Sequence, residues 1–313
     1  MPVDPQLQPF LDARNAQPPL DALSVEEARA RLKVYPLPGA RADAVASVDD
    51  RAIPGPAGPL GLRVYTPRGG PGPLPLLVFF HGGGFVVCDL GTHDALCRNL
   101  CDGAGCVVAS VDYRLAPEHR FPAAPDDCLA ATRWAAENAA ELGVDAARVA
   151  VAGDSSGATL AAVTALRVRD EGGPRLAGQL LVYPSADLGL PPTPSLAEFG
   201  EGFGLGAGDL RWFWGKYLAP GDERHPHASP MRAPDLHGLP PALVVTAECD
   251  PLRDDGERFA ARLQEAGVPT TVTRYGGMAH GFFTLAGLLA KADAAQTEAC
   301  AWLGGALAAT AER

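Results

Sequence analysis

The sequence of 313 residues contains no apolar run close to the roughly 18 to 20 residues that a membrane-spanning helix requires. Its basic residues form no patch or tail, and the formal net charge is −11. These features argue against stable insertion into a membrane and against the binding of nucleic acids. Neither feature identifies what the protein does bind.

The seven cysteines show no C-x-x-C spacing, and an odd number of them cannot all form disulfides within one chain. No leader with a charged segment, an apolar stretch and a cleavage site is recognisable at the beginning of the sequence. We therefore expect free thiols and a cytoplasmic protein. His225 and His227 are spaced as H-x-H, but no matching cysteines or carboxylates accompany them, so we expect a surface loop and no metal site.

The chain does contain a regular alternation of apolar runs and helical patterns. Runs such as 76–80 and 242–247 are continuous and short, which is typical of strands that are buried on both faces of a sheet. The alternation predicts an α/β fold with a mostly parallel sheet flanked by helices. The expected strands are two within 47–67, the second being 60–66, then 76–80, 106–112, one before Ser155, 179–183, 242–247 and 270–275. The expected helices are 28–35, 92–102, 128–142, 155–169, 209–218, 253–266 and 290–308.

Two parts of the chain depart from this alternation. Residues 1–45 look helical and amphipathic, and Ser24 with Glu27 has the spacing of a capping box. Residues 185–230 contain closely spaced prolines and glycines followed by an aromatic segment, which indicates an insertion. Adjacent aromatics cannot all share one face of a helix, so we expect some to line a pocket and others to pack against the core. The aromatic residues are Trp212, Phe213, Trp214 and Tyr217.

Ser155 lies in the segment RVAVAGDSSGA, residues 148–158, where an apolar run breaks and a helix of small residues begins. A serine at the tip of a tight strand-to-helix turn needs small neighbours, which Gly153 and Gly157 provide. The N–H groups at the start of the helix would face a developing negative charge. The pattern G-x-S-x-G is weak evidence by itself, but its position between a strand and a helix indicates a catalytic nucleophile.

A serine nucleophile needs a base to accept its proton and an acid to orient that base. His280, in GGMAHGFF, follows the last predicted strand, and Asp250, in AECDPLRDD, follows the strand before it. The carboxyl ends of parallel strands meet at one edge of a sheet, so we expect both residues near Ser155. Glu248 and Asp254 are competing carboxylates, but the loop position of Asp250 favours it. The resulting chain order is that of α/β-hydrolases.

Three glycines follow the strand 76–80 in the motif HGGGF. Backbone N–H groups can approach a developing oxyanion only where side chains are absent. We therefore expect Gly83 and Gly84 to form an oxyanion hole together with the backbone N–H of Ser156, the residue after the nucleophile. His81 is expected to hold the glycine loop through a hydrogen bond rather than to transfer protons.

Together these motifs resemble those of the hormone-sensitive-lipase-like (bacterial family IV) carboxylesterases of the α/β-hydrolase fold. The resemblance covers residues 75–285, and its most specific motif is the segment 112–127. The matching segments are HGGGF at 81–85, DYRLAPEHRFPAAPDD at 112–127, GDSSG at 153–157, DPLRD at 250–254 and HGF at 280–282. The family usually has alanine and glycine where Ser156 and Ala158 stand. The hydroxyl of Ser156 could compete with the oxyanion for the backbone donor or hold a water molecule.

The resemblance implies the roles already inferred for the nucleophile, the base, the orienting acid and the oxyanion hole. It also implies a helical cap over the active site, and it makes a homodimer an expectation. The implied division is a cap formed by residues 1–45 and 185–230, and a catalytic domain formed by residues 46–184 and 231–313.

We therefore predict a serine carboxylesterase that hydrolyses short- to medium-chain esters of small molecules through an acyl-enzyme intermediate. No cofactor or metal ion is expected. Two alternatives remain open at this point. The same triad could hydrolyse an amide, as an amidase or deacetylase does. The scaffold could also serve as a non-catalytic receptor for a small ligand, although the receptors that resemble this family have lost the histidine that His280 supplies here.

Overall fold

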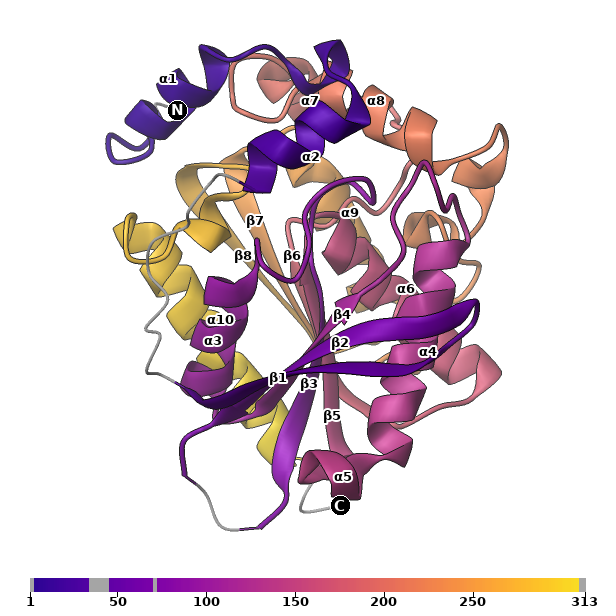
Figure 1. Ribbon diagram of the computed structural model, residues 1–313. Helices are drawn as coiled ribbons and strands as arrows, with labels where there is room; N and C mark the ends of the chain where they lie inside the picture. Colours follow the sequence, from indigo (N-terminus) through magenta and orange to yellow (C-terminus); the bar gives the residue numbers. More distant parts are fainter. Residues whose placement is uncertain (1–2, 34–44, 70–71, 310–313) are drawn as a thin grey trace.

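The computed structural model describes residues 3–33, 45–69 and 72–309. Within these ranges, eight strands form one sheet in the order β1-β2-β4-β3-β5-β6-β7-β8 (Figure 1). The strands from β4 through β8 in this order run parallel, whereas β2 is antiparallel to both of its neighbours. The strands are β1 (Val45–Gly55), β2 (Gly58–Pro67), β3 (Leu74–Phe80), β4 (Val107–Asp112), β5 (Val144–Asp154), β6 (Leu176–Val182), β7 (Ala242–Cys249) and β8 (Thr270–Ala279).

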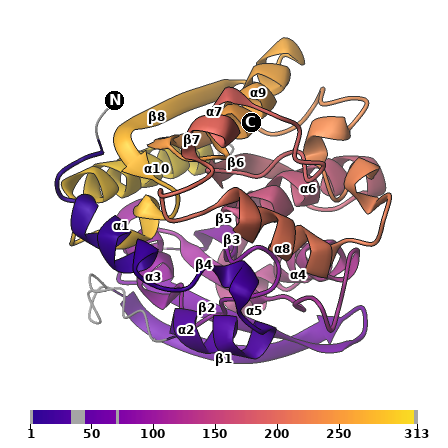
Figure 2. The same cartoon turned by 90° about the horizontal axis from the view of Figure 1, so that it is seen from above.

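Helices cover both faces of the sheet, as the sequence predicts (Figures 1 and 2). One face packs against α3 (Asp94–Ala104) and α10 (Ala290–Ala309), and the other packs against α4 (Ala123–Glu137), α6 (Ser156–Glu171) and α9 (Arg253–Glu265). Strand β3 illustrates why its sequence is continuously apolar. Leu77 and Phe79 belong to the core on the face covered by α3 and α10. Leu76, Val78 and Phe80 belong to the core on the face covered by α4, α6 and α9. Each successive side chain is therefore buried.

Most predicted elements are present, with differences at their ends. The helix expected over 128–142 is two helices, because α4 ends before Asn138 and a short helix α5 (Ala139–Leu142) follows. The side-chain amide of Asn138 donates to the carbonyl oxygen of Trp134 at 2.8 Å. The helix expected over 28–35 is α2 (Val25–Lys33), and residues 34 and 35 lie outside the described part of the chain. The capping box before it is confirmed, since Ser24 and Glu27 exchange hydrogen bonds of 2.9 and 3.2 Å.

Two segments far apart in the sequence lie together above the carboxyl edge of the sheet (Figure 1). We call residues 3–33 and 185–230 the cap segments. Arg14 Nε and Asn15 Nδ2 of the first segment donate to the carbonyl oxygens of Gly204 and Gly202 of the second, at 2.9 and 2.7 Å. The first segment contains α1 (Gln8–Asn15), η1 (Leu20–Ala22) and α2, and the second contains α7 (Pro194–Phe199), α8 (Ala207–Tyr217) and η2 (Asp222–Arg224).

The remaining short helices are η3 (Pro230–Arg232) and η4 (Phe282–Leu285). None of the helices within the described ranges is long and apolar enough to cross a membrane.

Asp255 of α9 holds the chain that leaves β6. Its Oδ2 accepts the backbone N–H groups of Ala186 and Asp187 at 2.7 and 3.1 Å, and its buried Oδ1 has no hydrogen-bond partner among the described residues. Burial raises the pKa of Asp255 to about 7, against the opposite effect of the two backbone hydrogen bonds. The native protein therefore holds a proton on this carboxyl at a pH where an unfolded chain has released it.

This proton makes stability depend on pH with a defined sign. The unfolded chain releases the proton near pH 4 and the native protein near pH 7, so native stability should fall as pH rises between these values. The Asp255→Asn variant lacks this dependence. From pH 5 to pH 8, the wild-type protein should lose about 2 to 3 kcal/mol of unfolding free energy relative to the variant, measured by urea denaturation.

The matched control is Asp254→Asn, because the pKa of Asp254 is lowered and its carboxylate stays charged throughout this range. The difference in unfolding free energy between Asp254→Asn and the wild-type protein should stay constant between pH 5 and pH 8. A constant difference for Asp255→Asn as well would contradict the account.

Candidate active site

Ser155 occupies the turn between the end of β5 and the start of α6. Its backbone has φ 54° and ψ −123°, a strained region for a residue with a side chain. The turn is too tight for side chains at the flanking glycines. A Cβ atom on Gly157 would overlap the carbonyl oxygen of Phe80, and one on Gly153 would overlap the backbone of Gly157. The G-x-S-x-G pattern is therefore a steric requirement of this turn.

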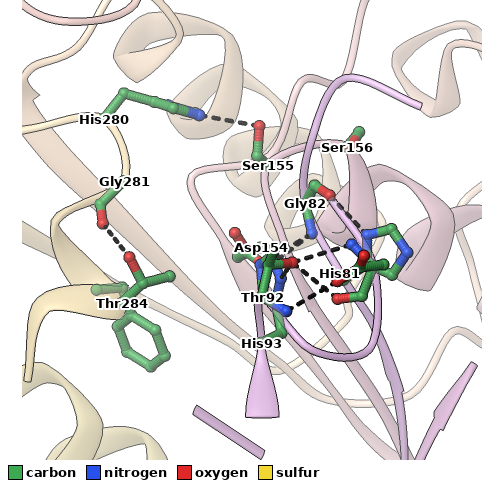
Figure 3. A network of polar contacts seen from close by, with 12 residues as sticks. His81, Gly82, Thr92, His93, Asp154, Ser155, Ser156, His280, Gly281 and Thr284 are labelled. Atoms are coloured by element: carbon green, nitrogen blue, oxygen red, sulfur yellow. Dashed lines mark hydrogen bonds and ion pairs between the residues drawn. The ribbon is translucent and has the colours of Figure 1, made fainter. Parts of the chain in front are cut away.

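Ser155, His280 and Asp250 lie in one hydrogen-bonded row. The Ser155 Oγ atom is 2.9 Å from His280 Nε2 (Figure 3), and His280 Nδ1 is 2.7 Å from Asp250 Oδ2. The Asp250 side chain is fully buried, whereas 11% of the His280 side chain remains exposed. The other oxygen of Asp250 accepts the backbone N–H of Leu252 at 2.8 Å, which fixes the carboxylate. In this arrangement the imidazole can accept the serine proton while the carboxylate orients the ring.

The two competing carboxylates are engaged elsewhere. Glu248 accepts the backbone N–H of Gly277 at 2.6 Å, and Asp254 accepts that of Ser195 at 2.8 Å. Of the three candidates, Asp250 is the one that the structure places against the histidine.

The glycine loop after β3 lies on the wall of the same cavity as Ser155. Gly83 and Gly84 have φ values of 116° and 60°. A Cβ atom at Gly83 would overlap the carbonyl oxygen of Val87, and one at Gly84 would overlap the ring of Phe213. Within the described residues, the N–H groups of Gly83 and Gly84 have no hydrogen-bond partner. Two unsatisfied donors beside a serine hydroxyl are what an oxyanion hole requires.

Two buried polar residues, Asp154 and His93, fix the start of this loop (Figure 3). Asp154 Oδ1 accepts the backbone N–H of Gly82 at 2.9 Å and lies 3.1 Å from His93 Nε2. The other ring nitrogen of His93 lies 3.0 Å from Thr92 Oγ1. Burial alone would raise the pKa of Asp154, but the charge and hydrogen bond of His93 hold that pKa below its usual value. A charged carboxylate next to the nucleophile thus anchors the glycine loop.

His81 holds the glycine loop through contacts with Gly82 and Tyr113. Its Nδ1 atom is 2.7 Å from the carbonyl oxygen of Gly82, and its own carbonyl oxygen accepts the hydroxyl of Tyr113 at 2.7 Å. The two rings stack with centroids 4.3 Å apart. Burial lowers the pKa of His81 to about 4, so the ring is neutral at pH 7. The prediction that His81 holds the loop through a hydrogen bond is confirmed.

The hydroxyl of Ser156 points at the other end of the glycine loop. It accepts the backbone N–H of Phe85 at 3.3 Å, and only 2% of the residue is exposed. This side chain therefore links the first turn of α6 to the loop. Ala158, the second departure from the family pattern, is fully buried in the core.

The cavity at Ser155 has a volume of about 250 Å³. The aromatic segment of α8 contributes to it unevenly, as expected: Phe213 lines the cavity, whereas Tyr217 stacks on Phe85 with ring centroids 3.9 Å apart. Much of the remaining wall comes from the cap segments and is apolar. These wall residues include Leu7, Phe10, Leu11, Leu20, Leu32 and Leu205.

Sequence reasoning missed three contributions to the site. The role of Asp154 had a signal, because this residue lies within the GDSSG motif, whereas His93 lies eight residues beyond HGGGF and had none. The resemblance implied a cap over the site, but an amphipathic pattern does not show which side chains of α1 line the cavity. The ring of Tyr183, which packs against His280 with centroids 4.5 Å apart, was likewise unmarked.

The H-x-H pair shows no sign of a metal centre. The backbone N–H of His227 donates to His225 Nδ1 at 3.0 Å. In the described part of the chain, no group of three or more histidine, cysteine or acidic residues is arranged to hold a metal ion.

Comparisons with known proteins identify relatives of the chain in sequence and in structure. A family model described as "alpha/beta hydrolase fold" matches residues 77–284. The chain is 45% identical to the esterase LipI of Mycobacterium tuberculosis over 94% of this chain and 92% of that protein. It is 38% identical to an ethyl acetate hydrolase of Pseudomonas putida over 88% of each protein. A hyperthermophilic esterase from Pyrobaculum calidifontis superimposes with a TM-score of 0.94 at 42% identity, covering 97% of this chain and 99% of that one.

The contact between Ser156 and Phe85 can be tested by the Ser156→Ala variant. Loss of the hydroxyl leaves the buried N–H of Phe85 without its acceptor and loosens the glycine loop. We expect kcat for a short-chain nitrophenyl ester to fall a few-fold and unfolding free energy to fall by about 1 kcal/mol.

The control for this variant is Thr164→Val in the same helix, because the buried hydroxyl of Thr164 has no hydrogen-bond partner among the described residues. It should change neither quantity appreciably. Wild-type kcat and stability in Ser156→Ala would show that the contact has no role.

Proposed function

The chain belongs to the hormone-sensitive-lipase-like carboxylesterases of the α/β-hydrolase fold, and from this membership we propose how its residues carry out ester hydrolysis. Its relatives include carboxylic ester hydrolases and esterases over nearly the whole chain, so the protein is a serine carboxylesterase that acts on small-molecule esters. The assignment of individual residues to steps of the reaction is our proposal.

In the proposed reaction, Ser155 Oγ attacks the carbonyl carbon of the ester while its proton passes to His280 Nε2. Asp250 orients the ring and stabilises its charged form. Collapse of the tetrahedral intermediate breaks the bond to the alcohol oxygen, which takes the proton from His280 and leaves. A water molecule then gives its proton to His280 and attacks the acyl carbon. Collapse of the second tetrahedral intermediate releases the acid, and Ser155 Oγ takes the proton back from His280. The hydrogen-bonded row of 2.9 and 2.7 Å supports these roles.

The negative charge of each tetrahedral intermediate would be held by the N–H groups of Gly83, Gly84 and Ser156. The unpartnered N–H groups of the two glycines support this proposal. Each such donor typically contributes about 3 kcal/mol to the stability of the transition state. The anchoring of Gly82 by Asp154 would keep the donors in place while the substrate changes shape.

We also propose that residues 1–45 and 185–230 act as a cap and that residues 46–184 and 231–313 form the catalytic domain. The position of the cap segments above the carboxyl edge of the sheet supports this division for the residues that the structure describes (Figure 2). The apolar cavity of about 250 Å³ beside Ser155 supports short- to medium-chain esters as substrates, because its walls suit an apolar acyl group.

The alternatives considered from the sequence are not favoured. The relatives are named as esterases rather than amidases or deacetylases. A non-catalytic receptor would have no need for a histidine hydrogen-bonded to the serine, and His280 makes that contact here.

Location and assembly are further proposals. All seven cysteines are free thiols in the structure, which supports a cytoplasmic protein. The net charge of −11 supports the absence of a nucleic-acid partner. Strand β8 ends the sheet and carries the exposed residue Val272, so this edge is where we propose that a homodimer forms.

The Ser155→Ala variant tests the proposed reaction. We expect kcat/KM for a short-chain nitrophenyl ester to fall by at least about 10³-fold, because Ser155 is the hydroxyl that is hydrogen-bonded to His280 and forms the acyl-enzyme in the proposed reaction. The matched control is Ser110→Ala, which removes a buried hydroxyl that has no hydrogen-bond partner among the described residues and should retain activity. Turnover near the wild-type rate in a folded Ser155→Ala protein would reject the proposal.

A further inference from the structure

Arg14 is a cation on the wall of the cavity that contains Ser155. The histidines and the carboxylate on that wall are already paired: His93 contacts Asp154, and His280 contacts Asp250. Arg14 has no such partner. Its Nε donates to the carbonyl oxygen of Gly204 at 2.9 Å, and within the described residues no carboxylate forms an ion pair with its guanidinium group.

The position of Arg14 is unusual because it belongs to two cavities. A second hollow of about 610 Å³ lies between the two cap segments, and Arg14, Leu20 and Gly204 form part of the wall of both spaces. The Arg14 side chain is half-buried at this junction. A chain that extends from Ser155 through the apolar cavity would therefore meet the guanidinium group where the two spaces join.

The outer hollow is rich in charge, but its other charged groups do not neutralise Arg14. Arg31 donates to the carbonyl oxygen of Pro18, and Arg211 is an exposed third cation. The carboxylate of Asp209 is occupied by the backbone N–H groups of Leu20 and Gly206, at 2.9 and 3.0 Å. The exposed side chain of Glu201 forms no ion pair with Arg14. Three arginines and two carboxylates line this hollow, so positive charge is in excess there.

The chemistry of guanidinium indicates what this position would bind. Arginine has five N–H donors in a planar fork, and Arg14 uses one of them on a neutral carbonyl oxygen. The remaining fork matches the two oxygens of a carboxylate. An apolar wall beside the cation strengthens that attraction, because water competes less for the donors. A structural role as a link between the cap segments would require only the bond from Nε, and Asn15 makes an equivalent link nearby.

We propose that this esterase prefers esters that carry a carboxylate at the end remote from the scissile bond, and that Arg14 binds that carboxylate. The substrates would be half-esters of dicarboxylic acids or esters of hydroxy acids, and the chemistry at the scissile bond is unchanged. The inference rests on the proposed function, because it assumes that Ser155 attacks an ester held in this cavity.

The test compares pairs of esters that differ only in the terminal group. The first series is 4-nitrophenyl half-esters of adipic to suberic acid, each with its primary-amide analogue, since an amide has the shape of a carboxylate but no charge. The second series carries the same pair of groups on the alcohol side, as acetate esters of hydroxy acids. The measured quantity is the ratio of kcat/KM for the carboxylate to that for the amide.

We expect this ratio to exceed about 10 in the wild-type protein in at least one series, at the chain length that reaches Arg14. In Arg14→Gln the ratio should fall to about 1, and in Arg14→Lys it should be intermediate, because lysine keeps the charge and loses the fork. The matched control is Asn15→Ala, which removes the neighbouring link between the cap segments and should keep the wild-type ratio.

Two results would overturn the inference. One is a wild-type ratio near or below 1 in both series at every chain length, and the other is a high ratio that survives in Arg14→Gln. Failure of the proposed function would look different. In that case Ser155→Ala would still hydrolyse the neutral amide-ended esters, whatever the ratio in the wild-type protein.

Discussion

The contact between the nucleophile turn and the end of β3 is the constraint on which the rest of the site depends. Gly157 lies so close to the carbonyl oxygens of Phe80 and His81 that no side chain fits there. This approach places Ser155 directly beside the glycine loop. It occurs between β3 and β5, where the order of the strands reverses: the chain adds β4 on one side of β3 and adds β6 on the far side of β5. Such switch points are where α/β sheets open a crevice for ligands.

The same contact explains why charge is buried here. The strained backbone of Ser155 can persist only if its surroundings hold it, and the neighbouring residue Asp154 provides a rigid connection to Gly82. A buried carboxylate is costly unless it is paired, and His93 supplies the partner. The hydroxyl of Ser156 adds a second link, to Phe85. The loop that would bind the oxyanion is therefore fixed at both ends by residues on either side of the nucleophile.

The sequence was sufficient for features that depend on local pattern. Continuous apolar runs identified the buried strands, and the position of Asp250 and His280 after two such strands brought them to one edge of the sheet. Features that depend on long-range packing could not be predicted. The break at Asn138 involves a side-chain contact within a helical pattern, and the pairing of His93 with Asp154 joins residues that are 61 positions apart. The placement of Arg14 at the cavity depends on how α1 meets a loop about 190 residues later.

The central claim is that Ser155 is a nucleophile activated by His280. A chromogenic organophosphonate ester tests it most directly, because the phosphorus atom reacts with an activated serine and stays bound. Mass spectrometry of the digested protein should find one phosphonate per chain, attached to Ser155, and labelling should be slowed at least about 10³-fold in His280→Ala. A phosphonate attached to another residue, or equally fast labelling without the histidine, would contradict the account.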